Sequence, residues 1–203
     1  MENIKNIVFD LGGVIITLDR DEAVRRFLAI GVNSAEELLD PYHQKGIFLA
    51  LEEGRVSCDE FYEEIRKLAG ANIPAEQIDY ALYGFLVNLP SYKLDMLEAL
   101  AGKYHLYLLS NTNPIIMGWA HDPKTWGREK VLPHYFEKMY LSYEIGATKP
   151  DQKIFDFLIE DSGIVPSETL FIDDGLANVE MGKRLGMKTY QPKNGEDFRH
   201  IFV

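Results

Sequence analysis

Residues 7–14 read IVFDLGGV, a short apolar run that ends in one aspartate and two glycines. The run begins near Ile4, and its length and β-branching predict a strand buried on both faces of a parallel sheet. A second run, LFIDD at residues 170–174, ends in two adjacent carboxylates. Open α/β sheets carry their binding and catalytic groups at the carboxyl ends of the strands. We therefore expect Asp10 to meet the pair Asp173–Asp174 at one edge of a sheet.

Acidic side chains that meet in this way are typical ligands of a hard divalent cation. Taken alone, Asp10 is better explained by turn chemistry, and Asp173–Asp174 is also compatible with the start of a loop or with a helix cap. Adjacent carboxylates after a buried strand repel each other, however, and a bound cation relieves that repulsion. Taken together, the two runs predict a metal-assisted enzyme.

Two different patterns divide the rest of the chain. Residues 18–89 show apolar side chains at helical spacing with few strand signals, which predicts an inserted helical cap domain of roughly four helices. Residues 1–17 and 90–203 alternate strand-like and helix-like runs, which predicts an α/β core domain with a doubly wound parallel sheet. The expected later core strands are 106–109, 138–141, 170–172 and 187–190, the expected helices are 93–101, 152–161 and 177–185, and a loop is expected after residue 109.

The composition and the net charge narrow the class of molecule that the protein binds. Among the 203 residues, 46% are hydrophobic and 26% are charged, as in ordinary globular proteins. A formal net charge of −11, with no basic tract, argues against nucleic-acid and anionic membrane partners. The single cysteine, Cys58, excludes an internal disulfide, and we recognise neither a secretory signal nor a membrane-spanning apolar run. We expect a cytoplasmic monomer or small homo-oligomer that acts on a small molecule.

Four short motifs follow one another near predicted strand ends or helix starts. They are Asp10 with Gly12-Gly13, Ser110-Asn111, Lys149-Pro150, and Asp173-Asp174 with Asn178. Their order and residue types resemble the haloacid dehalogenase (HAD) superfamily, and the insert after the first motif resembles the α-helical cap of its phosphatase-like branch. The resemblance implies a Rossmann-like core and a Mg²⁺-dependent hydrolase of a small phosphate ester, with a sugar phosphate as the favoured substrate.

The resemblance also implies a nucleophile and a metal site. Asp10 attacks phosphorus and forms an aspartyl-phosphate that water later hydrolyses. Asp10, the backbone carbonyl of Gly12 and Asp174 hold the magnesium ion, while Asp173 assists through a water molecule. The metal neutralises the charge of the phosphate dianion, which otherwise repels an anionic nucleophile.

The remaining motif residues are expected to bind the substrate or to support the site. Lys149 contacts both Asp10 and a phosphoryl oxygen, which stabilises charge in the transition state. Ser110 and Asn111 hold the phosphate together with Lys149. Asn178 lies one helical turn beyond the acidic pair and holds either Lys149 or a carboxylate of the metal site.

Gly12 is the main departure from the family pattern. Family phosphatases usually carry an aspartate two residues after the nucleophile, where it serves as general acid and base. General acid–base catalysis is worth ~10²- to 10⁴-fold in rate. Slow turnover, a good leaving group or a substitute such as Asp19 all remain open, as does a non-catalytic module that binds phosphate and metal. A 2-haloacid dehalogenase-type hydrolase is the other alternative, and Asp173–Asp174 opposes it because dehalogenation needs no metal.

Several further residues are expected to have structural roles. The pair Glu52-Glu53 is interpreted as a solvated helix face. Aromatic residues of the insert are expected mainly in its core. For the residues after Asn113, packing of the two tryptophans is the simpler account, and lining of a substrate entrance is the alternative. These two groups are Phe48, Phe61, Tyr62, Tyr80, Tyr83 and Phe85, and Trp119, His121, Trp126 and Arg128.

Overall fold

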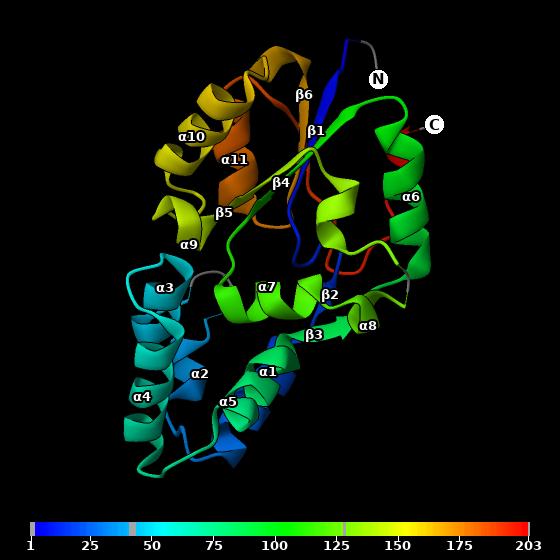
Figure 1. Ribbon diagram of the computed structural model, residues 1–203. Coiled ribbons are helices and arrows are strands. Elements are labelled where there is room, and N and C mark those ends of the chain that lie inside the picture. Colours follow the sequence, from blue (N-terminus) through cyan, green and yellow to red (C-terminus); the bar gives the residue numbers. More distant parts are fainter. Residues whose placement is uncertain (1–2, 41–43, 128, 203) are drawn as a thin grey trace.

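A five-stranded parallel sheet, in the order β5-β4-β1-β6-β7, occupies the upper part of the computed structural model (Figure 1). The structure describes residues 3–40, 44–127 and 129–202. From β1 at the centre, the chain builds the sheet outward in both directions, which confirms the predicted doubly wound topology. The strands are β1 (Asn6–Phe9), β4 (His105–Ser110), β5 (Lys138–Leu141), β6 (Thr169–Ile172) and β7 (Lys188–Tyr190).

Helices cover both faces of this sheet, with α6 on one side and α10 and α11 on the other (Figure 1). Ile7 and Phe9 of β1 belong to one hydrophobic cluster, which also contains residues of α6 (Ser91–Ala101) and α7 (Pro114–His121). Val8 belongs to the opposite cluster, with residues of α10 (Gln152–Ser162) and α11 (Leu176–Arg184). Because all three side chains are fully buried, this strand reads as a continuous apolar run.

Between the short strands β2 (Thr17–Leu18) and β3 (Leu86–Asn88), the described residues form five α-helices, where the sequence predicted roughly four. β2 and β3 pair antiparallel, so both ends of this helical region leave the core side by side. The region has its own hydrophobic cluster, and in it the ring of Phe48 meets those of Phe27 and Phe61 edge-on. Its helices are α1 (Arg20–Ala29), α2 (Ala35–Leu38), α3 (Gly46–Glu52), α4 (Cys58–Ala69) and α5 (Ala75–Leu82).

The expected loop after β4 was wrong, because α7 begins there at Pro114. The side chain of Asn113 accepts hydrogen bonds from the backbone N–H groups of Ile115 and Ile116, and Pro114 occupies the first helical position. Both features are ordinary signals for the start of a helix. The remaining elements are α8 (Pro123–Trp126), α9 (Ser142–Ile145) and the 3₁₀ turns Tyr83–Phe85, Leu132–Tyr135, Pro166–Glu168 and Arg199–Phe202.

The two tryptophans that follow Asn113 serve packing, as expected, whereas His121 is exposed. Trp126 is buried in the core cluster and its indole N–H donates to the carbonyl of Ala120, while Trp119 packs against the same cluster. Arg128 lies outside the described residues. No helix in the described ranges has both the length and the apolar character needed to cross a membrane.

Candidate active site

Three carboxylates and one ammonium group converge at the carboxyl ends of the central strands. Oxygen atoms of Asp10, Asp173 and Asp174 lie within 4.8 Å of one another. This follows from the sheet register, because Phe9 of β1 pairs with Ile172 of β6 and the acidic residues come directly after them. The structure therefore brings together the two acidic runs in the way that the sequence predicted.

The buried ammonium group of Lys149 uses all three of its donors within this cluster. Its Nζ lies 2.9 Å from Asp10 Oδ1, 2.6 Å from Asp173 Oδ2 and 2.7 Å from the carbonyl oxygen of Leu109. Burial opposes the charged form, but the two carboxylates outweigh it and raise the pKa of Lys149. The lysine is therefore a permanent positive charge at the site.

The two oxygens of Asp10 have different surroundings. Oδ1 accepts from the N–H of Leu11 at 2.7 Å and faces Lys149, whereas Oδ2 has no donor among the described residues. Burial raises the pKa of Asp10 to about 7, although Lys149 acts in the opposite direction. One oxygen is thus held in place, and the other is free to meet a cation or an electrophile.

Asp173 is already satisfied by protein donors. Its Oδ1 accepts from the N–H of Gly175 at 2.8 Å and from Asn178 Nδ2 at 2.9 Å, while Oδ2 accepts from Lys149. Of the two partners expected for Asn178, the structure selects the carboxylate. Because Asp173 is fully buried, its geometry suits a role in orienting its neighbours rather than direct metal contact.

The side chain of Asp174 packs against Gly13, in the glycine turn of the first motif. A Cβ atom on Gly13, which has φ +72°, would lie only 2.1 Å from Asp174 Oδ2, so this cradle exists only because residue 13 lacks a side chain. Burial, and then the charge of Asp173, raise the pKa of Asp174 to about 6. A cluster of oxygen donors with unbalanced negative charge fits a hard divalent cation such as Mg²⁺.

The second and third motifs are joined through Asn111. Its side-chain oxygen accepts from the N–H of Lys149 at 2.7 Å, and its Nδ2 donates to the carbonyl of Lys149 at 2.9 Å. The amide therefore holds the lysine loop in place, and contact of Asn111 with substrate stays a prediction. Ser110 lines a cavity next to the carboxylate cluster, and its hydroxyl has only a long 3.5 Å contact with the Asn111 carbonyl.

A side chain at position 12 would meet the end of the Leu18 side chain. A Cβ on Gly12 would lie 2.8 Å from Leu18 Cδ1, so a longer side chain requires Leu18 to move. Asp19, the substitute considered from the sequence, accepts from the N–H of Glu22 at 2.9 Å and caps α1 instead. Asp19 is also absent from the cavity lining.

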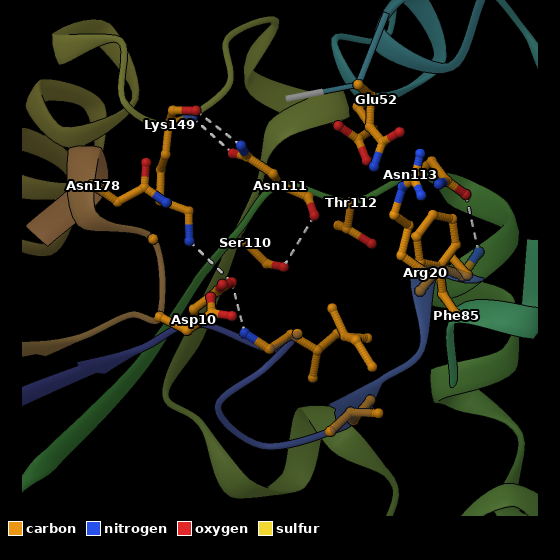
Figure 2. Close-up of a pocket in the computed structure, with 18 of the residues that line it drawn as sticks. Asp10, Arg20, Glu52, Phe85, Ser110, Asn111, Thr112, Asn113, Lys149 and Asn178 are labelled. Carbon is orange, nitrogen blue, oxygen red and sulfur yellow. Dashed lines mark hydrogen bonds and ion pairs between the residues drawn. The ribbon is translucent and has the colours of Figure 1, made fainter. Parts of the chain in front are cut away.

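A cavity of about 1190 Å³ lies between the carboxylate cluster and the helical region. Its wall includes Arg20, Phe48, Glu52 and Phe85, and the close-up view labels Glu52 among the residues that line the cavity (Figure 2). The interpretation of Glu52 as a solvated residue was therefore wrong. Burial, and then the negative charge of Asp10, raise the pKa of Glu52 to about 8.

In the sequence, the adjacent residues Glu52 and Glu53 look alike, but their side chains have different surroundings in the structure. Glu53 pairs with Arg55 outside the cavity, at a distance of 2.5 Å, whereas Glu52 turns inward at the last position of α3. Phe48 belongs to the expected hydrophobic cluster and also lines the cavity. Which of two adjacent glutamates faces the cavity is decided by contacts between segments that are distant in the sequence. The local sequence carries no signal for such contacts.

Comparisons with known proteins agree with this geometry. A sequence profile described as haloacid dehalogenase-like hydrolase matches residues 4–186. The chain belongs to the haloacid dehalogenase-like hydrolase family. It is 50% identical over 196 residues to a D-ribitol-5-phosphate phosphatase of Bacteroides thetaiotaomicron, covering 97% of this chain and 95% of that protein.

Solved structures of this hydrolase family share the whole fold. A predicted HAD-like family hydrolase from Porphyromonas gingivalis is 47% identical, with a TM-score of 0.94 over 98% of this chain and 96% of that one. A wild-type HAD family enzyme from Bacteroides thetaiotaomicron, solved with magnesium and inorganic phosphate, is 45% identical, with a TM-score of 0.90. That match covers 98% of this chain and 100% of the other.

Proposed function

We propose that this hydrolase is a Mg²⁺-dependent phosphatase of a small phosphorylated metabolite, namely a sugar or sugar-alcohol phosphate, and that it acts through an aspartyl-phosphate on Asp10. The observation that carries the proposal is the cluster of Asp10, Asp173 and Asp174 around the buried ammonium of Lys149. A phosphate monoester brings about two negative charges near an anionic nucleophile, and such a cluster with a bound cation offsets them.

Asp10, the carbonyl of Gly12 and Asp174 would hold the metal, with Asp173 supporting them. When bound, the ion supplies Lewis-acid neutralisation of the phosphoryl oxygens. The residues fit it because they offer oxygen donors only, and because Gly13 leaves space beside Asp174.

The chain's own residues then perform two displacements at phosphorus. A carboxylate oxygen of Asp10 forms a bond to phosphorus while the ester P–O bond breaks, and the leaving oxygen takes a proton from water. A second water molecule attacks the same phosphorus and the bond to Asp10 breaks. The proton that this water loses neutralises the hydroxide left in the first step, and inorganic phosphate leaves. Lys149 fixes Asp10 and offsets charge on the transferring group, and Ser110 holds a phosphoryl oxygen.

Two comparisons support this reaction over the alternatives. The 50% identical relative is named a D-ribitol-5-phosphate phosphatase, and a 45% identical enzyme is solved with magnesium and inorganic phosphate. We further propose that residues 18–89 act as a cap over the cavity and that residues 1–17 and 90–203 form the catalytic core. The cavity that the two parts share is consistent with this division.

The test is phosphate release from a panel of phosphate esters that includes D-ribitol 5-phosphate. We expect turnover that requires Mg²⁺ and falls at least ~10³-fold in Asp10→Asn. Asp19→Asn is the matched control, since Asp19 caps α1 outside the cavity, and it should keep normal turnover. Mg²⁺ binding without turnover on the panel would instead favour a binding module, and halide release from a 2-haloacid without Mg²⁺ would favour a dehalogenase.

A further inference from the structure

Two polar atoms in the wall of the cavity lack a hydrogen-bond partner among the described residues. They are the side-chain oxygens of Gln44, from the helical region, and Thr112, from the core. The carboxylate of Glu52 lines the same cavity and likewise accepts no hydrogen bond from any described residue. Buried polar atoms are normally satisfied, so an unsatisfied set in a cavity wall indicates a bound partner.

Thr112 is held rigidly by its backbone. Its N–H donates to Ser142 Oγ and its carbonyl accepts from the same hydroxyl, both at 3.0 Å. The residue is only 3% exposed, yet its own hydroxyl oxygen is unpaired. The side chain is therefore fixed in place with an unused donor and acceptor.

Glu52 is held against the core although it belongs to the helical region. Two residues later, Gly54 has φ +63°, and a Cβ there would lie 2.1 Å from the carbonyl oxygen of Tyr143 in α9. This close approach fixes the end of α3 on the core, and Figure 2 shows Glu52 among the residues that line the cavity. The carboxylate consequently has a defined position relative to the catalytic cluster.

The charges of these cavity residues favour substrate groups that donate hydrogen bonds over substrate groups that are anionic. The oxygen of Gln44 is an acceptor, the carboxyl group of Glu52 is either neutral or negative, and the only cation besides Lys149 among the described lining residues is Arg20. The guanidinium of Arg20 is already engaged by the carbonyls of Leu39 and Glu36 and by the Glu36 carboxylate. A second anionic group of a substrate would meet Glu52 without a free positive charge to balance it.

We infer that Glu52, Thr112 and Gln44 form a subsite that binds the hydroxyl groups of the leaving alcohol and selects neutral, hydroxyl-rich phosphate esters over substrates with a second anionic group. The inference rests on the proposed phosphatase function. Substrate hydroxyls satisfy the unpaired oxygens of Gln44 and Thr112 and bind the carboxyl group of Glu52, and apolar lining residues such as Phe48 and Phe85 cover the carbon chain.

The experiment compares three substrates in wild type and in Glu52→Gln, with Glu53→Gln as the matched control. D-ribitol 5-phosphate has hydroxyls and a poor leaving group, n-pentyl phosphate has the same leaving-group type without hydroxyls, and p-nitrophenyl phosphate needs no leaving-group protonation. We expect Glu52→Gln to lower kcat/KM for D-ribitol 5-phosphate about 10- to 100-fold and to change it less than about 3-fold for the other two. Glu53→Gln should leave all three unchanged, since Glu53 pairs with Arg55 outside the cavity.

The subsite also has a second readout. Thr112→Val removes the unpaired hydroxyl at nearly constant volume, and it should lower kcat/KM selectively for D-ribitol 5-phosphate. Equal losses on D-ribitol 5-phosphate and n-pentyl phosphate in Glu52→Gln would overturn the inference and indicate an acid at the leaving oxygen. Unchanged kcat/KM in both variants would overturn it as well. Failure of the phosphatase proposal is distinct, because wild type would then hydrolyse none of the three.

Discussion

The substitution Gly13→Ala tests whether the site beside Asp174 is a metal site without altering any functional group. The new Cβ would lie 2.1 Å from Asp174 Oδ2 and 2.5 Å from Cγ, where ordinary contacts begin at 3.4 Å. The carboxylate must therefore retreat by about 1.3 Å. Mg²⁺ accepts ligands at about 2.0–2.1 Å and demands nearly ideal geometry, so a shift of this size removes Asp174 from the coordination sphere.

We expect the Mg²⁺ dissociation constant of Gly13→Ala to rise at least ~100-fold, equivalent to about 2.7 kcal/mol, measured by isothermal titration calorimetry. Alanine at φ +72° also costs about 1 kcal/mol of folding free energy. Gly163→Ala is the control for that strain, since Gly163 has φ +70° and no atom within 4 Å of a built Cβ. Near-ultraviolet circular dichroism verifies that both variants are folded.

The two variants separate backbone strain from metal binding. Both should lose a similar free energy of unfolding from the left-handed backbone, but only Gly13→Ala should lose Mg²⁺ affinity. If a folded Gly13→Ala bound Mg²⁺ as tightly as Gly163→Ala, the placement of the ion beside Asp174 would be refuted.

Two further predictions concern stability. In the metal-free protein, the pKa values of Asp10 and Asp174 are raised to about 7 and about 6, whereas both groups lose their protons near pH 4 in the unfolded chain. Because the folded state binds more protons, the free energy of unfolding falls as the pH rises from about 4 to about 7. Mg²⁺ should therefore raise Tm more at pH 8 than at pH 5 in calorimetry, and equal gains at both pH values would contradict this reasoning. Lys93 is 1% exposed and donates to two backbone carbonyls at 2.7 and 2.6 Å, so Lys93→Met should cost about 1–3 kcal/mol in urea unfolding. The exposed control Lys103→Met should cost less than about 0.5 kcal/mol, and an equal loss in both variants would refute a role for the buried ammonium.

The core of the fold was predictable because its signals are local. Two apolar runs, one ending at Asp10 and one at Asp173–Asp174, predict buried parallel strands. The register of these strands then brings the carboxylates together. Helix caps such as Ser57 and Gly70 also act within a few residues of their own helix. Such local signals predict structure well because they depend little on contacts with the rest of the chain.

The parts that were missed depend on contacts between distant segments. Nothing near Glu52 distinguishes it from Glu53, because the difference is created where the end of α3 meets the carbonyl of Tyr143. The β2–β3 pair joins two short strands separated by the whole helical region, so neither strand has a strong signal of its own. The start of α7 at Pro114 was signalled by Asn113, but Asn-Pro also reads as a turn.

A crystal structure with Mg²⁺ and beryllium fluoride, which mimics a phosphoryl group on a carboxylate, would test the proposed chemistry at its reacting atoms. We predict beryllium fluoride bonded to a carboxylate oxygen of Asp10, with Mg²⁺ held by Asp10, the Gly12 carbonyl and Asp174, and with Lys149 near a fluorine atom. Beryllium fluoride bound elsewhere, or Mg²⁺ absent from these three ligands at saturating concentration, would contradict the account.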